Sequence, residues 1–185
     1  MGEKTYDYVC YTDGACDDNT AGKANRGGYG IVILLRDGFR DEFYEGYTHT
    51  TNNRMELMGV IKALENTDEG SSVLIISDSK YVVDGCSKWM RNWKARGWII
   101  GKTLRQAQPL KNLDLWWTID ELMAKRSVEF QWIKGHSGNE WNELADKLAE
   151  KATREAEFRD MDGDLTVESV GMAQLEKLRG VSMFV

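Results

Sequence analysis

The chain has 185 residues, of which 42% are hydrophobic, and its formal net charge is −6. This length favours one domain with a real core, and no apolar run approaches the roughly 18 residues of a membrane span, so we expect no membrane association and, without a signal-peptide pattern, a cytoplasmic protein. Three cysteines without CxxC spacing indicate neither a disulfide framework nor a zinc site.

Three strands are predicted in the first part of the chain, at residues 6–12, 30–36 and 39–48. The first strand is rich in aromatic and β-favouring residues and ends at Asp13. A polar loop is expected over residues 15–28, and Asp37 followed by Gly38 is a hairpin signal between the second and third strands. The three strands should therefore form an antiparallel meander.

A helix is predicted to begin within residues 50–57, whose sequence is TTNNRMEL. The apolar residues from Leu57 to Leu64 recur at helical spacing and mark one buried face. Glu56 in the first turn has a simple interpretation, because an acid there offsets the helix dipole by a few tenths to about 1 kcal/mol. Other isolated acids along the chain argue for a larger role.

Strands and helices then alternate. The apolar run at residues 72–77 is typical of a buried parallel strand and ends on Asp78. The pattern is helical from Lys80 to a break at Gly97, and Pro109 is expected to open another helix.

A fifth strand is predicted at residues 128–133, and a helix should run from about Glu140 past Lys151. Strands followed by helices after a meander predict an α/β fold with a five-stranded mixed sheet flanked by helices. Residues 1–152 are expected to form this domain. Residues 153–185 are an acidic linker and a tail, for which disorder, a short helix or packing on the domain is favoured over docking to a protein partner.

A local basic arm is predicted on the acidic body, because residues 88–111 carry seven basic side chains and no acidic one. Such side chains supply affinity for phosphates. Tryptophans are interleaved with them, and we expect Trp89 and Trp98 to be partly packed and Trp93 to be more exposed.

Four isolated acids mark the candidate site. Asp13 and Asp78 are placed at strand ends, where ligand sites of α/β sheets gather, and Glu56 and Asp146 lie on helices. Alone, Asp13 has a turn interpretation and Asp78 a helix-cap interpretation. Converging carboxylates repel one another unless a cation neutralises them, and oxygen ligands suit Mg²⁺ or Mn²⁺. Two such ions roughly 4 Å apart suit in-line displacement at phosphorus.

Six segments, in this order, resemble the type 1 ribonuclease H family, and the chain is similar to its bacterial ribonuclease HI members with a basic protrusion. They are TDG at 12–14, GGYG at 27–30, TTNNRMEL at 50–57, SDS at 77–79, WIKGHSG at 132–138 and NELAD at 142–146. Each segment alone is weak, but the ordered set is specific. The resemblance implies a ribonuclease H-like fold and an endonuclease that hydrolyses the RNA strand of RNA/DNA hybrids, leaving 5′-phosphate and 3′-hydroxyl ends.

The resemblance also implies residue roles. Asp13, Glu56, Asp78 and Asp146 would bind the metal ions, and His136 would assist proton transfer or product release. The basic arm with its tryptophans can bind phosphates and sugars without reading bases. Asparagine amides can donate a hydrogen bond to the 2′-hydroxyl of RNA or accept one from it. The implied substrate contacts are Thr51, Asn52, Asn53, Trp89, Trp93, Lys94, Arg96 and Asn112. A monomer is expected by default.

Two departures from the family pattern are present. The loop between Cys16 and Gly27 is longer, so the hybrid-contacting asparagine of the family cannot be assigned to Asn19 or Asn25. His49 stands where relatives often carry arginine in a pocket for a DNA phosphate, which predicts a weaker and more pH-dependent grip on the DNA strand.

Two other functions compete with a hybrid ribonuclease. A DNA nuclease or integrase-like enzyme is disfavoured because the basic arm and the asparagine pair match hybrid binders. A binding module without activity is disfavoured because all four carboxylates are present. Cleavage of a uniform hybrid but not of duplex DNA would separate the first function from the other two.

Overall fold

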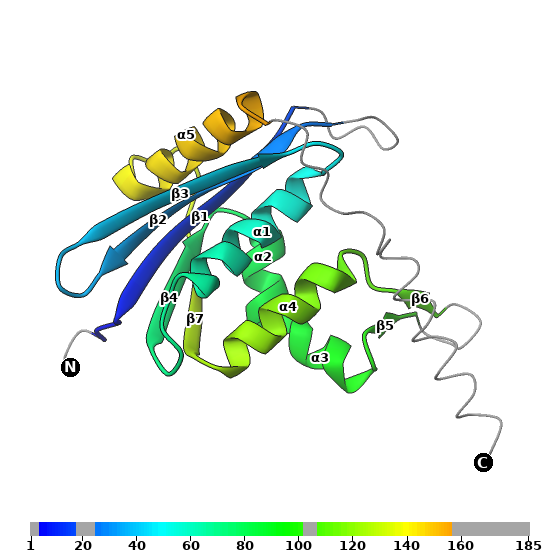
Figure 1. The fold of residues 1–185 in the computed structure, drawn as a ribbon. Helices are drawn as coiled ribbons and strands as arrows, with labels where there is room; N and C mark the ends of the chain where they lie inside the picture. Colours follow the sequence, from blue (N-terminus) through cyan, green and yellow to red (C-terminus); the bar gives the residue numbers. More distant parts are fainter. Residues whose placement is uncertain (1–3, 18–24, 102–106, 157–185) are drawn as a thin grey trace, which may run out of the picture.

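The computed structural model describes residues 4–17, 25–101 and 107–156. A five-stranded sheet with the order β3-β2-β1-β4-β7 forms its centre (Figure 1). Strands β1, β2 and β3 pair antiparallel, whereas β4 pairs parallel to β1 and β7 parallel to β4. The predicted α/β fold with a meander and two parallel strands is thereby confirmed. The strands are β1 (Tyr8–Cys16), β2 (Gly27–Leu35), β3 (Arg40–Tyr47), β4 (Ser72–Ser77) and β7 (Ser127–Trp132).

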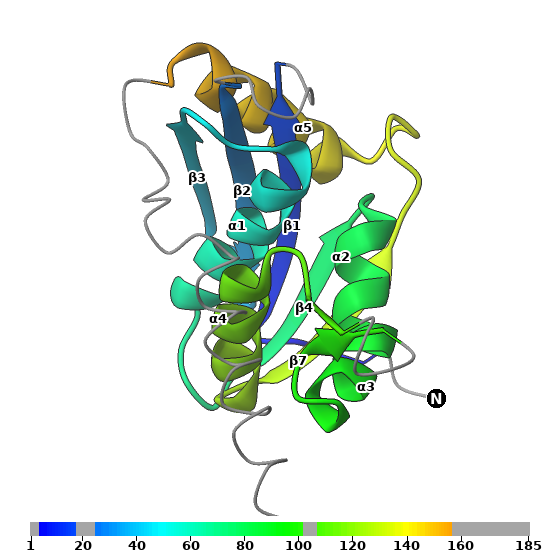
Figure 2. The same ribbon diagram turned by 90° about the vertical axis from the view of Figure 1, so that its right-hand side faces the viewer.

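Helices cover both faces of this sheet (Figures 1 and 2). Among the described residues, helix α5 (Glu140–Arg154) alone covers one face. The other face carries α1 (Asn52–Glu65), α2 (Lys80–Asp84), the π-helical turn η1 (Gly85–Trp89), α3 (Met90–Ala95) and α4 (Leu113–Ala124). Two short strands, β5 (Ile99–Ile100) and β6 (Gln108–Pro109), pair beside α3 and α4. None of the helices in the described ranges is long and apolar enough to cross a membrane.

The alternation of side chains along β2 creates two cores, because successive residues of a strand point to opposite faces. Ile31 and Ile33 join the larger core under α1 and α4, around the fully buried Trp116. Val32 joins the smaller core under α5, with Leu148. Because both faces of β2 bury apolar side chains, a one-residue slip would move each of them to the wrong face. The register of β1 against β2 is therefore strongly specified.

The GGYG segment lets α5 lie directly on the backbone of β2. An added Cβ at Gly30 would come within 2.1 Å of the Ala145 carbonyl oxygen, and one at Gly28 within 2.4 Å of the Ala152 Cβ. Real Cβ atoms do not approach so closely, so only glycine permits this packing. The packing matters for the site because Asp146 is carried by α5.

Two predicted boundaries are wrong. Strand β1 does not end at Asp13 but continues to Cys16, because the antiparallel pairing with β2 runs on to Gly27. Asp13 is thus inside a strand and not after it. Pro109 does not open a helix: it pairs with Ile99 in the β5-β6 ribbon, and α4 begins after Asn112.

The helix predicted to pass Lys151 extends to Arg154. The acidic tail from residue 157 onward lies outside the described residues, as do residues 18–24 of the long loop and residues 102–106 of the basic arm.

Candidate active site

Three of the predicted acids meet at one point. Asp13 points from β1, Glu56 from α1 and Asp78 follows β4, and each offers one carboxylate oxygen within 4.8 Å of those of the others. Strands β1 and β4 are parallel neighbours, so their side chains can share an edge of the sheet. The glycine after Asp13 completes the approach, since a Cβ on Gly14 would lie 2.4 Å from the Glu56 backbone nitrogen.

Glu56 has no dipole-compensating role. Helix α1 begins at Asn52, which leaves no acid in its first turn, and Glu56 is only 5% exposed. The Asn52 Nδ2 donates to Glu56 Oε1 at 3.5 Å, whereas Oε2 is buried without a hydrogen-bond partner among the described residues. A buried carboxylate oxygen with no donor is costly unless a cation or water meets it.

Asp78 is not a helix cap either, because the Ser79 hydroxyl accepts from the Val82 N–H and caps α2. The Asp78 carboxylate accepts instead from Asn142 Nδ2 at 3.1 Å. Asn142 is 2% exposed and belongs to α5. Its contact was missed as part of the site, although its place four residues before Asp146 on one helix face was a signal.

Asp146 stands beside the three acids and is not one of the tight group. Its Oδ2 lies 3.7 Å from Nδ1 of His136, whose side chain is 83% exposed. Burial and the Glu150 carboxylate, one helical turn further along α5, raise the pKa of Asp146. Glu150 also raises the pKa of Asp13, so it adds to the negative field of the site, a contribution that the sequence did not predict.

Burial and mutual repulsion make the group favour neutralisation. Burial and the Asp78 carboxylate raise the pKa of Asp13 to about 8. Burial and the Asp13 and Asp78 carboxylates raise the pKa of Glu56 well above its usual range. Two charges 4 Å apart near a protein surface repel by about 4 kcal/mol, so protons or a cation must compensate them. An all-oxygen donor set with an unpartnered buried oxygen fits a hard divalent cation.

We therefore expect the stability of the metal-free protein to fall as pH rises from about 4 to about 8. In that window Asp13 holds a proton in the folded state that the unfolded chain has already released, so unfolding becomes easier at higher pH. The raised pKa of Glu56 contributes in the same direction. A divalent cation replaces these protons and should stabilise the protein more at the upper end of the window. Urea unfolding with Mg²⁺ or chelator measures both effects. If Mg²⁺ raised the free energy of unfolding of the Asp13→Asn variant as much as that of the wild type, the stabilisation would not come from the carboxylate group.

The other predicted site residues lie at the starts of α1 and α4 and on or after α3. Thr51 is the N-cap of α1, Asn53 is exposed, and Asn112 lies at the start of the neighbouring α4. Lys94 and Arg96 are exposed on and after α3, where Lys94 forms a 2.7 Å ion pair with Asp120.

The expectation that Trp93 is more exposed than Trp89 is wrong. Trp93 packs edge-on against the buried Trp116, with ring centroids 5.0 Å apart. Trp89 is instead 39% exposed. The physical reason is that α3 rests on α4, so its Trp93 face is the inner one.

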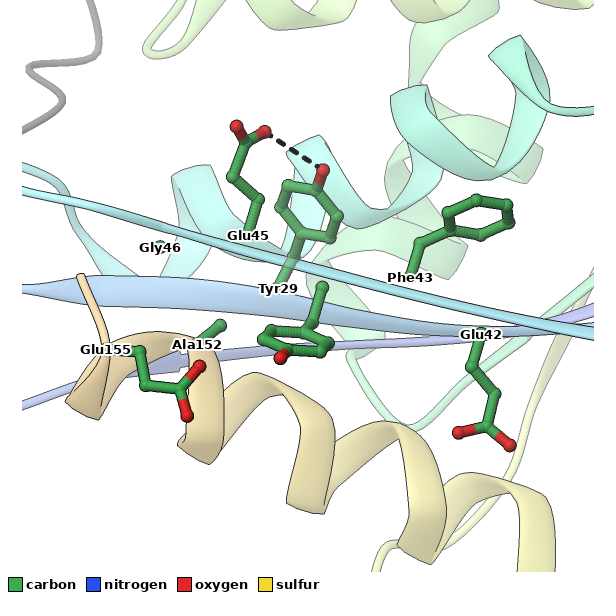
Figure 3. Close-up of a pocket in the computed structure, with 8 residues that line it drawn as sticks. Tyr29, Glu42, Phe43, Glu45, Gly46, Ala152 and Glu155 are labelled. Atoms are coloured by element: carbon green, nitrogen blue, oxygen red, sulfur yellow. Dashed lines mark hydrogen bonds between the residues drawn. The ribbon is translucent and has the colours of Figure 1, made fainter. Parts of the chain in front are cut away.

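A separate pocket of about 510 Å³ lies between the edge strand β3 and the end of α5 (Figure 3). Of its lining residues, Tyr29 and Glu45, which are joined by a 3.2 Å hydrogen bond, lie on one side of the strands, and Glu42 and Glu155 lie on the other side. None of the predicted site residues lines it. The carboxylate group of Asp13, Glu56 and Asp78 therefore lies outside this pocket.

A family model described as RNase H matches residues 5–154. The chain belongs to the RNase H family. It is 44% identical to ribonuclease H of Alcanivorax borkumensis over 82% of this chain and 94% of that protein. It is 50% identical to ribonuclease HI of Synechocystis over 75% of this chain and 82% of that protein.

Among solved structures, LC9-RNase H1, described as a type 1 RNase H with the type 2 active-site motif, superposes with a TM-score of 0.72 at 27% identity and covers 95% of this chain and 87% of that one. The chain is thus a ribonuclease H enzyme, and the sequence resemblance to that family is confirmed. The RNase H family is divalent-metal dependent, which agrees with the acidic group formed by Asp13, Glu56 and Asp78.

Proposed function

We propose that this ribonuclease H hydrolyses the RNA strand of RNA/DNA hybrids without sequence preference, with two Mg²⁺ ions held by Asp13, Glu56, Asp78 and Asp146. The convergence within 4.8 Å of three carboxylates, one on β1, one on α1 and one directly after β4, carries this proposal. Mn²⁺ has the same preference for oxygen ligands and can substitute. The products are 5′-phosphate and 3′-hydroxyl ends.

The ions, when bound, would activate water and stabilise the leaving oxygen. The protein's own residues prepare that chemistry. Asn142 holds the Asp78 carboxylate by its 3.1 Å hydrogen bond, and Asn52 holds one oxygen of Glu56. His136 is exposed beside Asp146, where it can take up or release a proton near the departing product.

The hybrid would lie across the start of α1 and toward the basic arm. Asn52 and Asn53 are near Glu56 at the start of α1 and suit the RNA strand. Their side-chain amides can both donate hydrogen bonds to the 2′-hydroxyl and accept them from it. The DNA strand would lie against Thr51 and Asn112. Further contacts, made mostly with phosphates and sugars, are proposed for Trp89, Trp93, Lys94 and Arg96.

Cleavage of a labelled hybrid tests the function. The same RNA, single-stranded or in an RNA duplex, and a DNA duplex are the controls, each in Mg²⁺ and in chelator. Metal-dependent cutting of the hybrid alone is expected. Cutting of duplex DNA would favour a DNA nuclease, and binding without cutting would favour a binding module.

We also propose a catalytic domain that ends near residue 152, with the remaining residues as a tail, and an enzyme that acts as a cytoplasmic monomer. The family match over residues 5–154 supports the boundary. A protein partner for the tail remains the less favoured alternative. Sedimentation of the full chain and of a chain ending at Arg154 tests the oligomeric state.

His49→Arg is expected to lower the KM for hybrid about threefold at about pH 8 and to leave it nearly unchanged at about pH 6. His49 is exposed two residues before Thr51, with a positive φ of 55°. An imidazole gains its charge only toward acidic pH, whereas a guanidinium is always charged. Initial rates against hybrid concentration at both pH values measure this. The same KM for variant and wild type across the range would refute it.

A further inference from the structure

Arg54 joins two helix starts that face the same side of the molecule. Its guanidinium forms two hydrogen bonds with the Asp114 carboxylate, at 3.1 and 2.7 Å, and so ties α1 to α4. The two side chains are only 19% and 25% exposed. Figure 2 shows α1 and α4 side by side on this face.

The same arginine also contacts the two residues that we place at the DNA strand. Its Nη1 donates to the Asn112 Oδ1 at 3.4 Å, and its backbone N–H donates to the Thr51 hydroxyl oxygen at 3.4 Å. The backbone hydrogen bond uses a lone pair of the Thr51 hydroxyl oxygen and leaves the O–H able to donate. The Arg54 side chain therefore acts on Asn112, while its backbone N–H holds Thr51.

Asn112 does not behave as an ordinary helix cap. It occupies the N-cap position of α4 in a left-handed conformation (φ 57°, ψ 33°), and its side chain makes no capping hydrogen bond with the described residues of that helix. Asparagine at an N-cap normally accepts from the first turn. Its amide is turned instead to Arg54 and to the Tyr81 hydroxyl, 3.1 Å away.

Arg54 decides which way the Asn112 amide points. A tyrosine hydroxyl can donate or accept, so Tyr81 alone would permit either orientation. The guanidinium can only donate, so it requires the amide oxygen on its own side and leaves the amide nitrogen facing Tyr81. Tyr81 also accepts from the indole N–H of the fully buried Trp116 at 3.2 Å, which holds the hydroxyl in place.

We propose that the Arg54–Asp114 ion pair is a positioning element, which fixes the Asn112 amide so that it and Thr51 both present donors to one acceptor group of the substrate. The second N–H of Asn112 is not used by Tyr81. Two donors suit a phosphate oxygen, which only accepts. Because Asp114 neutralises the guanidinium, Arg54 acts through Asn112 and does not itself attract the phosphate. This inference rests on the proposed hybrid substrate.

The test measures hybrid binding by fluorescence anisotropy in the Asp13→Asn background, which does not turn over. Arg54→Met should raise Kd about five- to tenfold, the effect of one fixed hydrogen bond. Asn112→Ala should raise Kd similarly, and Arg54→Met should add nothing in that background. In the active enzyme, Arg54→Met should raise KM and leave kcat unchanged.

Two further variants exclude simpler causes. Arg54→Met with Asp114→Leu removes both charges, so no carboxylate is left unpaired, and it should match Arg54→Met in Kd. Lys62→Met removes another paired cation of α1, which lies 2.8 Å from Glu65, and should leave Kd unchanged.

The inference is overturned if Arg54→Met leaves Kd unchanged, or if it weakens binding by the same factor with and without Asn112, as a direct phosphate contact would. Failure of the wild-type enzyme to cleave the hybrid would refute the proposed function separately. Absence of hybrid binding in both the wild-type enzyme and the Asp13→Asn parent would overturn both.

Discussion

Asp13→Asn is expected to lower kcat on an RNA/DNA hybrid by at least about a thousandfold, because the stabilisation that bound metal gives to a phosphoryl transition state is several kcal/mol. The substitution keeps the shape of the side chain and its 2.8 Å hydrogen bond from the Gly14 N–H. It removes only the charge. Single-turnover cleavage in Mg²⁺ measures the loss, and hybrid binding should persist.

The matched control is Asp41→Asn, which makes the same chemical change on the exposed edge strand β3. It should cleave at the wild-type rate. The metal-free Asp13→Asn protein should also be more stable than the wild type near pH 8, because burial and the Asp78 carboxylate hold the pKa of Asp13 at about 8. Wild-type activity in Asp13→Asn would mean that the carboxylate group is not the catalytic centre.

Local patterns carried most of the fold. The apolar residues of β2 and β4, the alternation in β7 and the helical spacing after Glu56 each reflect burial, and the structure has these elements within a few residues of prediction. The end of β1 was missed because the turn-like pair Asp13 and Gly14 is held in the strand by pairing with β2, which a local pattern does not reveal. Pro109 was misplaced for a similar reason, since Ile99 pairs with it.

The acids of the site were predictable because each lies within or directly after a recognisable element. The residues that orient them were not. Asn142 reaches Asp78 across 64 positions, and Arg54 reaches Asp114 across 60, so neither contact leaves a periodic trace. Trp93 shows the same limit, because only the docking of α3 on α4 decides which tryptophan of the arm packs against the buried Trp116.

Gly30→Ala is expected to destabilise the protein by about 3 kcal/mol, near the upper end for overpacking. The new methyl group would lie 2.1 Å from the Ala145 carbonyl oxygen and 2.6 Å from the Ala149 nitrogen. Both are backbone atoms, so no side-chain rotation relieves the clash and α5 must move away from β2. Urea unfolding measures the loss.

The same movement should reach the chemistry, because Asp146 follows Ala145 on α5. A displacement of about 1 Å in a catalytic group can lower a rate about a hundredfold, so kcat should fall at least tenfold at temperatures where the variant is folded. Gly59→Ala is the control: its Cβ would lie 3.4 Å from the Thr12 Cβ, in ordinary contact, and alanine favours the interior of α1 by up to about 1 kcal/mol. Gly59→Ala should therefore keep full activity with unchanged or higher stability. Equal unfolding midpoints for Gly30→Ala and wild type would show that α5 tolerates a larger separation from the sheet, and Asp146 would then not depend on this glycine.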